Sequence, residues 1–296
     1  MLPDDQLTSA LDRAAALAEG SKWTRLLHQP FRYLSAIAFR HLFYPLFKQP
    51  WKRKCRTFFG TEMTVDLPAG MDLFLLGCKT HDSELRLARF FILFIQPGDK
   101  IADVGAHFGY FSLLAAHLAG PEGAVWSFEP GSATHAVLTP NTQAFQQMEV
   151  HRLLVGAENG IRDFWEFPTL FSEYNTTRPD SVPEHLHGRK TQLASTRLDT
   201  FFTARQTAPR LIKIDVEGAE YEVVQGLEGL FEQGFFPVLA MEYLGEQGHQ
   251  QAVKWLLMRG YQVFVPASTG ELQACNTWET WLQDQGIDSE NFVLVR

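Results

Sequence analysis

Two carboxylates and two glycines stand at a spacing that suits binding of a nucleotide. Asp103 and Gly105 lie at the end of a short apolar run, Gly109 follows, and Glu129 ends the next apolar run. Glycine lets a ligand approach the backbone closely, and a carboxylate can accept two hydrogen bonds from a ribose diol. The spacing therefore predicts a pocket for a ligand that carries a nucleoside.

The sequence around the glycines separates two classes of nucleotide cofactor. A dinucleotide site normally carries G-x-G-x-x-G, whereas this chain has Gly105-Ala-His-Phe-Gly109, which leaves less room for a pyrophosphate. Asp103 is an acid inside an apolar strand, and a positively charged methionyl group or backbone donors would offset the cost of burying it. The pattern favours a binding site for S-adenosylmethionine. The alternative is a β-α-β unit without such a site, in which the glycines only pack the helix and Glu129 is a surface residue.

A second group of charges lies in the segment Leu211-Ile-Lys-Ile-Asp-Val216. Lys213 and Asp215 alternate onto one face of the expected strand, and Glu217 follows it. Charges on a central strand are unexpected for packing alone, although a structural ion pair with a helix-capping acid is the alternative. Because this strand is expected beside the glycine strand, Asp215 and Glu217 are predicted to project towards the transferred group.

Alternating strands and helices must position these residues. Apolar runs predict strands at 101–104, 125–128, 150–155, 211–216, 237–243, 261–265 and 292–295, with helices at 82–95, 110–118, 132–145, 219–230 and 250–258. Such alternation predicts an α/β fold with a doubly wound sheet, whose ligands bind beyond the carboxyl ends of the strands. A β-hairpin is expected over 57–76, with its turn at 67–70.

The chain is expected to divide into an N-terminal helical appendage, residues 1–56, and a cofactor-binding domain, residues 57–296. Within the domain, residues 168–190 are polar and lack periodicity. A loop of this length in a compact domain is often functional. Since it follows the third strand, it is predicted to be a substrate lid, with Tyr174 and Asn175 near the substrate.

Charge is distributed unevenly along the chain. The net charge is −8, yet residues 21–60 hold nine bases and no acid, so the remainder has 17 bases against 34 acids, or −17. The basic segment is also aromatic. The favoured interpretation is a helical appendage that packs on the catalytic domain or on a second subunit. Peripheral contact with an anionic membrane is the next alternative, and nucleic-acid binding is disfavoured because the rest of the chain would repel phosphates.

The location is predicted to be cytoplasmic, with attachment to the membrane periphery as a variant. The three cysteines, Cys55, Cys78 and Cys275, show no metal-binding or disulfide pattern. The first residues lack the basic region of a signal peptide, and no apolar stretch is long enough to span a membrane.

Four motifs together resemble the FkbM-type methyltransferases. They are Asp103-Val-Gly-Ala-His-Phe-Gly109, Phe128-Glu-Pro130, Leu198-Asp199 and Ile212-Lys-Ile-Asp-Val-Glu-Gly-Ala-Glu220. The resemblance implies an S-adenosylmethionine-dependent enzyme with the seven-stranded class I fold. It also implies methyl transfer to a hydroxyl of a sugar, glycolipid or polyketide. By this likeness Asp103, Gly105, Gly109 and Glu129 hold the cofactor, while Asp215 and Glu217 lie by the acceptor.

Further residues complete the predicted site. Additional cofactor contacts are expected from Ala106, His107, Tyr110, Pro130, Gly156 and Asp215, with Gly156 beside the adenine. Lys213 and Glu242 are expected near the substrate. The base that takes the acceptor's proton is predicted to be Asp215, with Glu217 and His107 as the other candidates. His107 could equally be a cofactor-loop residue. A divalent metal held by Asp215 and a second acid stays an alternative, but no ligand spacing supports it, so no metal is predicted.

Partners and rival functions are also open to prediction. The acceptor is expected to be a small molecule or a glycan- or lipid-linked molecule, with no nucleic acid, and the oligomeric state is left open. A nucleotide-dependent oxidoreductase could use the same fold. A non-catalytic cofactor-binding scaffold that recruits partners through the basic helix is the other alternative.

Overall fold

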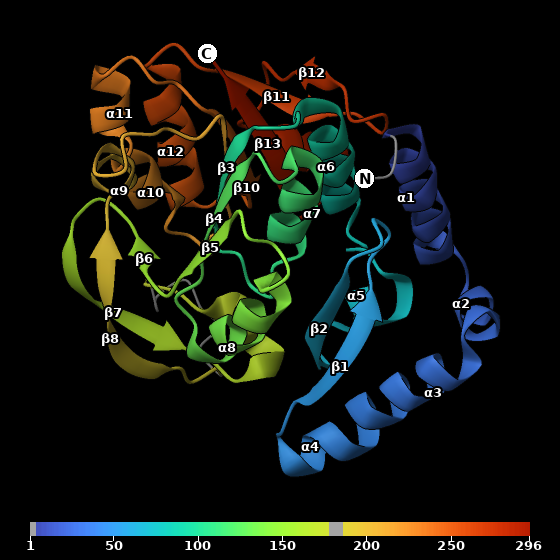
Figure 1. Cartoon of the computed structure of the whole chain (residues 1–296). Coiled ribbons are helices and arrows are strands. Elements are labelled where there is room, and N and C mark those ends of the chain that lie inside the picture. Colours follow the sequence, from blue (N-terminus) through green and yellow to red (C-terminus); the bar gives the residue numbers. More distant parts are fainter. Residues whose placement is uncertain (1–3, 178–185) are drawn as a thin grey trace.

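The computed structural model describes residues 4–177 and 186–296, and its centre is one eight-stranded sheet (Figure 1). The strands of this sheet are β3 (Lys100–Val104), β4 (Ala124–Phe128), β5 (Met148–His151), β9 (Leu211–Ile214), β10 (Val238–Tyr243), β11 (Gln262–Pro266), β12 (Leu272–Ala274) and β13 (Glu290–Val295). Their order is β12-β11-β13-β10-β9-β3-β4-β5. The α/β prediction is confirmed, but the sheet has one strand more than the seven expected. The additional strand is β12, a short and partly exposed edge strand whose sequence lacks a clear apolar run.

The parallel centre of the sheet consists of β5, β4, β3, β9 and β10. Val104 lies beside both Phe128 and Ile214 in the register, so the carboxyl ends of the three strands meet at one edge. The same register places Asp103 beside Lys213. Strand β13 runs antiparallel to both β10 and β11.

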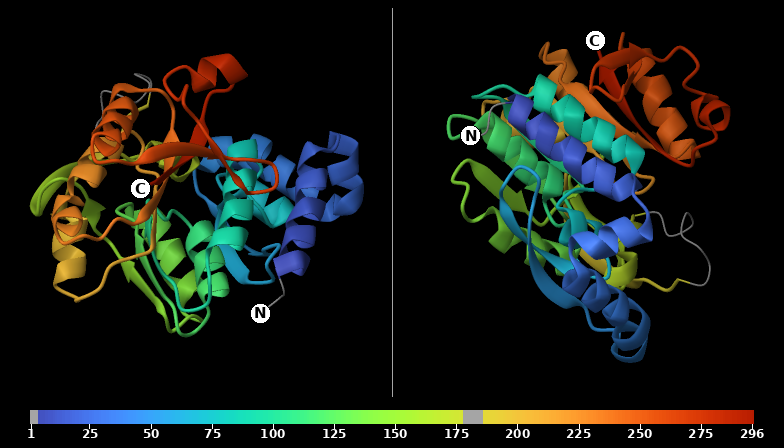
Figure 2. Two further views of the ribbon diagram at one scale, coloured as in Figure 1. Left: turned by 90° about the horizontal axis from the view of Figure 1, so that it is seen from above. Right: turned by 90° about the vertical axis from the view of Figure 1, so that its right-hand side faces the viewer.

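Helices cover both faces of the sheet, as Figures 1 and 2 show. One face packs on α6 (Asp82–Phe94) and α7 (Tyr110–Ala119). The other face packs on the helices α9 (Leu198–Thr203), α10 (Glu220–Gln225), α11 (Glu228–Glu232) and α12 (Gln247–Leu257). The remaining helices of the domain are α5 (Met71–Leu76), α8 (Ser132–Thr142), the 3-10 helix η2 (Thr169–Tyr174) and α13 (Trp281–Gln285).

Two smaller sheets flank the large one. Strand β1 (Trp51–Arg56) forms a hairpin with β2 (Glu62–Leu67). The other small sheet contains β6 (Leu154–Val155), β7 (Gly160–Glu166) and β8 (Arg189–Thr196). The hairpin expected over 57–76 is therefore wrong in position, since its second half is helix α5. The strand expected over 150–155 is divided between two sheets, because β5 pairs with β4 whereas β6 pairs with β8.

The N-terminal segment forms α1 (Asp4–Glu19), α2 (Lys22–His28), α3 (Pro30–Ala38), the π-helix η1 (Phe39–Phe43) and α4 (Tyr44–Phe47). Helix α1 packs along α6 (Figure 2), with Leu7 and Leu11 fully buried. Arg89 also forms an ion pair of 2.8 Å with Asp12. Residues 51–56 are a strand, so the helical part of the segment ends at Phe47. None of the helices in the described ranges combines the length and apolarity needed to cross a membrane.

Candidate active site

A cavity of about 510 Å³ opens at the carboxyl ends of the central strands. Its wall contains residues from the glycine loop after β3, the end of β4, and the ends of β9 and β10. The predicted site residues that line it are Asp103, Gly105, Ala106, His107, Tyr110, Glu129, Pro130, Asn175, Lys213, Asp215, Glu217 and Glu242. The structure thus brings together most of the side chains that were singled out by residue type and spacing.

Gly105 allows the two central strand ends to approach each other. It has a φ of +83°, and a Cβ atom there would lie 1.7 Å from the carbonyl oxygen of Asp215. The Asp215 N–H donates to the Val104 carbonyl at 3.0 Å, which ties the same two segments together. Only glycine fits this crossing, so Gly105 fixes the position of Asp215 as well as that of the loop.

Glu129 stabilises the glycine loop from the end of β4. Its Oε2 accepts a hydrogen bond of 2.7 Å from the backbone N–H of His107. Its Oε1 accepts from the Gly131 N–H at 2.8 Å and from the Thr134 hydroxyl at 2.7 Å. Burial raises the pKa of Glu129, against the effect of these donors. A carboxylate has about four acceptor positions, so Oε2 keeps capacity for a hydroxyl of a ligand in the cavity.

Asp103 lies deeper in the cavity wall and is 2 % exposed. Its Oδ2 accepts a hydrogen bond of 2.5 Å from the Ser112 hydroxyl. Its Oδ1 is buried and accepts no hydrogen bond from any described residue, and the Lys213 Nζ lies 3.9 Å away. Burial raises the pKa of Asp103, although Lys213 opposes this. A lysine and a serine thus provide part of the pairing of this acid, which the sequence predicts for the ligand or for backbone donors.

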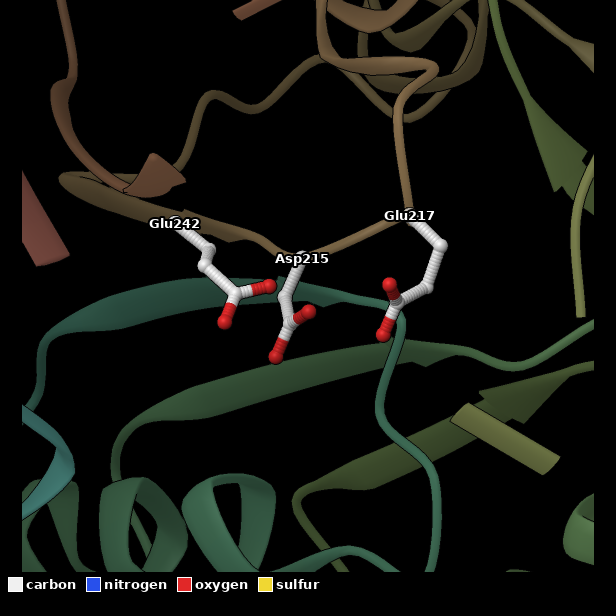
Figure 3. A group of neighbouring side chains, drawn as sticks. All are labelled: Asp215, Glu217 and Glu242. Atoms are coloured by element: carbon white, nitrogen blue, oxygen red, sulfur yellow. The ribbon is translucent and has the colours of Figure 1, made fainter. Parts of the chain in front are cut away.

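Three carboxylates gather at the ends of β9 and β10, and Figure 3 shows them pointing towards one another. Asp215, Glu217 and Glu242 each place a carboxylate oxygen within 4.8 Å of the others. Asp215 also accepts a hydrogen bond of 2.8 Å from the buried Lys213 ammonium. An acidic group of this kind can bind a hydroxyl or accept a proton from it.

The acids of this cluster differ in protonation. Burial, together with the neighbouring Asp215 and Glu217 charges, raises the pKa of Glu242 well above its ordinary value. Burial also acts to raise the pKa of Asp215, but the Lys213 ammonium outweighs it and lowers that pKa. At neutral pH Asp215 is therefore ionised beside a Glu242 that holds its proton more tightly than usual.

His107 occupies an unusual place in the glycine loop. It has a φ of +50° without being glycine, and its Nε2 lies 2.9 Å from the Ser172 hydroxyl. Burial, followed by the nearby Lys79 cation, lowers the pKa of His107 to about 3. The imidazole is therefore neutral at physiological pH and is a weak base.

Part of the predicted lid contributes to the cavity wall. Leu170, Ser172, Asn175 and Thr176 line it, and the Thr176 hydroxyl donates to the Glu217 carbonyl at 3.1 Å. Through Ser172 and Thr176 this segment contacts both the glycine loop and the acidic cluster. The prediction for residues 178–185 falls outside the described residues, as does that for the side chain of Tyr174.

Two predicted residues do not line the cavity. Gly109 is the N-cap residue of α7, and a Cβ atom there would lie 2.5 Å from a methyl carbon of Leu138. Gly156 donates its N–H to the Thr196 carbonyl, and its own carbonyl lies against Gly226. The backbone of Gly156 is engaged by these neighbours, and the apolar wall near this point consists of Leu153, Leu154 and Val155 instead.

Other functional residues were not identified from the sequence. Lys79 and Arg40 line the cavity although they are distant in sequence from every motif. Glu220 is fully buried, and its Oε1 accepts from the N–H groups of Val216 and Gly218, so it holds the loop that carries Glu217. Glu220 belongs to the Lys-Ile-Asp-Val-Glu-Gly-Ala-Glu motif, which was the available signal for it. Lys79 and Arg40 had no such signal.

The strand order and the cavity define a doubly wound α/β domain that binds a ligand beyond the carboxyl ends of its strands. A family model described as the methyltransferase FkbM domain matches residues 103–263. The chain belongs to this family, and S-adenosylmethionine is the cofactor of the family.

Two curated proteins are similar to part of the chain. The 31-O-demethyl-FK506 methyltransferase FkbM of Streptomyces tacrolimicus is 32% identical over 145 residues, which cover 47% of this chain and 52% of that protein. Methyltransferase 1 of Beauveria bassiana is 27% identical over 150 residues, covering 45% and 60%. The chain thus matches between half and two thirds of the length of these relatives.

Solved structures are more distant. The O-methyltransferase of Bacillus cereus in complex with SAH is 11% identical, with a TM-score of 0.39 and coverage of 71% of this chain and 80% of that one. Fibrillarin of Aeropyrum pernix with bound S-adenosyl-L-methionine is 10% identical, with a TM-score of 0.37 and coverage of 67% and 66%.

The cavity fits the charged cofactor of this family. The buried Asp103 Oδ1 is an acceptor without a hydrogen-bond donor among the described residues, and it suits the ammonium group of a methionyl moiety. Glu129 offers a carboxylate to a ribose diol. The acids that line the cavity outnumber its lysines and arginines, which favours a cationic sulfonium.

Proposed function

We propose that this protein transfers a methyl group from S-adenosylmethionine to a hydroxyl oxygen of a sugar, glycolipid or polyketide-like acceptor. The observation that carries the proposal is one cavity in which Asp103 and Glu129 stand beside the cluster of Asp215, Glu217 and Glu242. The name of the Streptomyces relative, an O-demethyl-FK506 methyltransferase, supports oxygen as the accepting atom.

The cofactor half of the cavity is assigned to Asp103 and Glu129. Asp103 would bind the methionyl ammonium through Oδ1, and Glu129 would bind the ribose while keeping its bond to the His107 N–H. Bound S-adenosylmethionine supplies an activated methyl group on a sulfonium, so the protein contributes mainly alignment and exclusion of water.

Asp215 is assigned the role of the base that accepts the proton of the acceptor hydroxyl. Because Lys213 keeps its carboxylate ionised, Asp215 can accept a hydrogen bond from the acceptor hydroxyl. As the oxygen–carbon bond forms, the hydroxyl becomes strongly acidic, and its proton passes to this carboxylate even though the pKa of Asp215 is low. Glu242, whose pKa is raised by burial and the neighbouring acids, is better suited to donate a hydrogen bond, while Glu217 orients the acceptor. Residues 168–177 cover the acceptor side of the cavity.

Transfer of a labelled methyl group to a panel of hydroxylated acceptors tests the proposal. The Asp215→Asn variant should bind S-adenosylmethionine normally by calorimetry and lose about 10²–10⁴ in kcat. Asp163→Asn, at a partly exposed acid of strand β7 that pairs with Lys190, is the matched control and should leave kcat unchanged.

Three results would contradict the proposal in different ways. If folded protein binds neither S-adenosylmethionine nor its demethylated product, the cofactor assignment fails. Binding of a nicotinamide dinucleotide in its place would favour the oxidoreductase. Binding of S-adenosylmethionine without turnover of any acceptor, together with tolerance of Asp215→Asn, would favour the scaffold.

A further inference from the structure

Large apolar side chains are exposed along one N-terminal segment. We call residues 22–48, which form α2, α3, η1 and α4, the helical ridge. Those of its large apolar residues that are at least half exposed are Trp23, Leu27, Phe31, Leu34, Leu42, Phe43, Leu46 and Phe47. Phe31 is 88% exposed. Apart from the neighbouring Phe235 and Phe236, the other exposed large apolar residues of the described chain lie on separate elements, so the ridge is distinctive in concentrating them.

The spacing of these residues pairs them on the faces of the separate helices. Trp23 and Leu27 are four residues apart within α2, and Phe31 and Leu34 are three apart within α3, so each pair shares one face of its own helix. Leu42 and Leu46 are four apart across η1 and α4. The side that faces the body is different, since Ala36 and Tyr44 are buried. In Figure 1 the ridge lies at the outer side of the β1–β2 hairpin, away from the large sheet.

The ridge is also the cationic part of the chain. It lies within the segment of nine bases and no acid, whereas the rest of the protein carries −17. Arg40 and Lys48 are exposed and form no ion pair with a described residue. Lys52 and Lys54 on the adjoining strand β1 remain exposed even though each contacts an acid.

We propose that the helical ridge docks on a lipid bilayer that contains anionic lipids. Apolar and aromatic side chains inserted at the headgroup boundary lose their contact with water, and bases at the same depth are attracted by the negative surface. Both features add to the membrane affinity of an amphipathic helix, and the ridge carries both.

A second copy of the chain fits the ridge less well. A symmetric dimer would place the same surface of both subunits in contact, and the bases of one ridge would then face the bases of the other. Contact between the ridge and an acidic face elsewhere on another copy would be head-to-tail and would not close into a dimer. Charge therefore favours an anionic surface that is not part of this chain.

The ridge adjoins the mouth of the cavity. Arg40 lines the cavity, and the Tyr44 hydroxyl accepts a hydrogen bond of 3.3 Å from the Leu170 N–H. Docking of the ridge would therefore bring the acceptor side of the site close to the membrane surface, where a lipid-linked acceptor could enter. This last step rests on the proposed function, whereas the docking itself does not.

Co-sedimentation with vesicles tests the proposal on the full chain. Vesicles of phosphatidylcholine with phosphatidylglycerol should bind the protein at low salt, and vesicles of phosphatidylcholine alone should bind it much more weakly. The double variant Phe31→Ser/Leu46→Ser should weaken binding by on the order of tenfold for each side chain. Lys48→Gln/Lys54→Gln should weaken it by about fivefold for each charge and reduce its dependence on salt.

The matched control is Ile161→Ser/Met258→Ser, which removes two exposed apolar side chains outside the ridge and should leave vesicle binding unchanged. Calorimetry with S-adenosylmethionine on the same variants shows that they are folded and separates this proposal from the proposed function. Absence of binding to the anionic vesicles, equal binding by the ridge variant, or a dimer in solution that the ridge variant abolishes would each overturn the proposal.

Discussion

Replacement of Gly105 by alanine tests whether the crossing of two strand ends builds the site. The new Cβ atom would lie 1.7 Å from the carbonyl oxygen of Asp215 and 2.8 Å from its carbonyl carbon. Real Cβ contacts are not shorter than about 3.0 Å, so the two segments must separate by more than 1 Å. This movement would break the hydrogen bond between the Asp215 N–H and the Val104 carbonyl.

The magnitude follows from a comparison with a second glycine. Gly234 has the same φ of +83°, but a Cβ atom there meets nothing within 4 Å. Gly234→Ala should therefore cost only the conformational strain, about 1–2 kcal/mol of unfolding free energy. Gly105→Ala adds overpacking of about 1–3 kcal/mol and a lost hydrogen bond of about 1 kcal/mol. It should be less stable than Gly234→Ala by about 2–4 kcal/mol.

Denaturant unfolding of the two variants measures this difference, and calorimetry measures their affinity for S-adenosylmethionine. Gly105→Ala should also lose cofactor binding, because its loop provides the His107 N–H that Glu129 accepts, while Gly234→Ala should bind normally. Equal unfolding midpoints and equal affinities in the two variants would refute the argument that the close approach of Gly105 and Asp215 determines the site.

Three further substitutions probe the buried charges. Lys213→Met leaves Asp103 and Asp215 without their cation and should destabilise the fold by about 3–5 kcal/mol; a thermal unfolding midpoint equal to that of wild type would contradict this. Burial raises the pKa of Glu220 from 4.5 to about 7. The free energy of unfolding of wild type should therefore fall by about 3 kcal/mol relative to that of Glu220→Gln as the pH rises from 4.5 to above 7. Denaturant midpoints of the two proteins that vary with pH in parallel would argue against this. Since the pKa of Glu242 is also raised, Glu242→Gln should gain stability over wild type as pH rises, and thermal unfolding at pH 5 and pH 8 checks the sign.

The sequence alone predicts which acidic side chains meet at the carboxyl ends of the strands. Asp103, Glu129 and Asp215 each lie at or just beyond the end of an apolar run, and parallel strands bring such ends to one edge of a sheet. Two of these acids also belong to motifs that include glycines. Local pattern and topology therefore agree, which is why the prediction of a shared cavity succeeded.

Other features depend on contacts that no local pattern reveals. Met71–Leu76 is a run of six residues, too short to distinguish a strand from a helix by periodicity, and it forms a helix that buries Leu73 and Phe74. Lys79 and Arg40 reach the cavity from parts of the chain that carry no motif. Burial and the Lys79 cation, which no motif places near His107, lower the pKa of the imidazole. The weakness of His107 as a base was therefore visible only in the structure.

One cation connects the two halves of the proposed site. Side chains two residues apart on a strand share a face, so Lys213 and Asp215 lie side by side, and the register of β9 with β3 places Asp103 next to Lys213. The ammonium is 2.8 Å from Asp215 and 3.9 Å from Asp103. It therefore lies nearer to the acid assigned to the acceptor and leaves Asp103 Oδ1 available. A cofactor ammonium at Asp103 would complete the pairing of the buried acids while Lys213 keeps Asp215 ionised. The unexpected lysine on a central strand thus has a physical explanation, because it keeps one acid ready for a proton and the other ready for the cofactor.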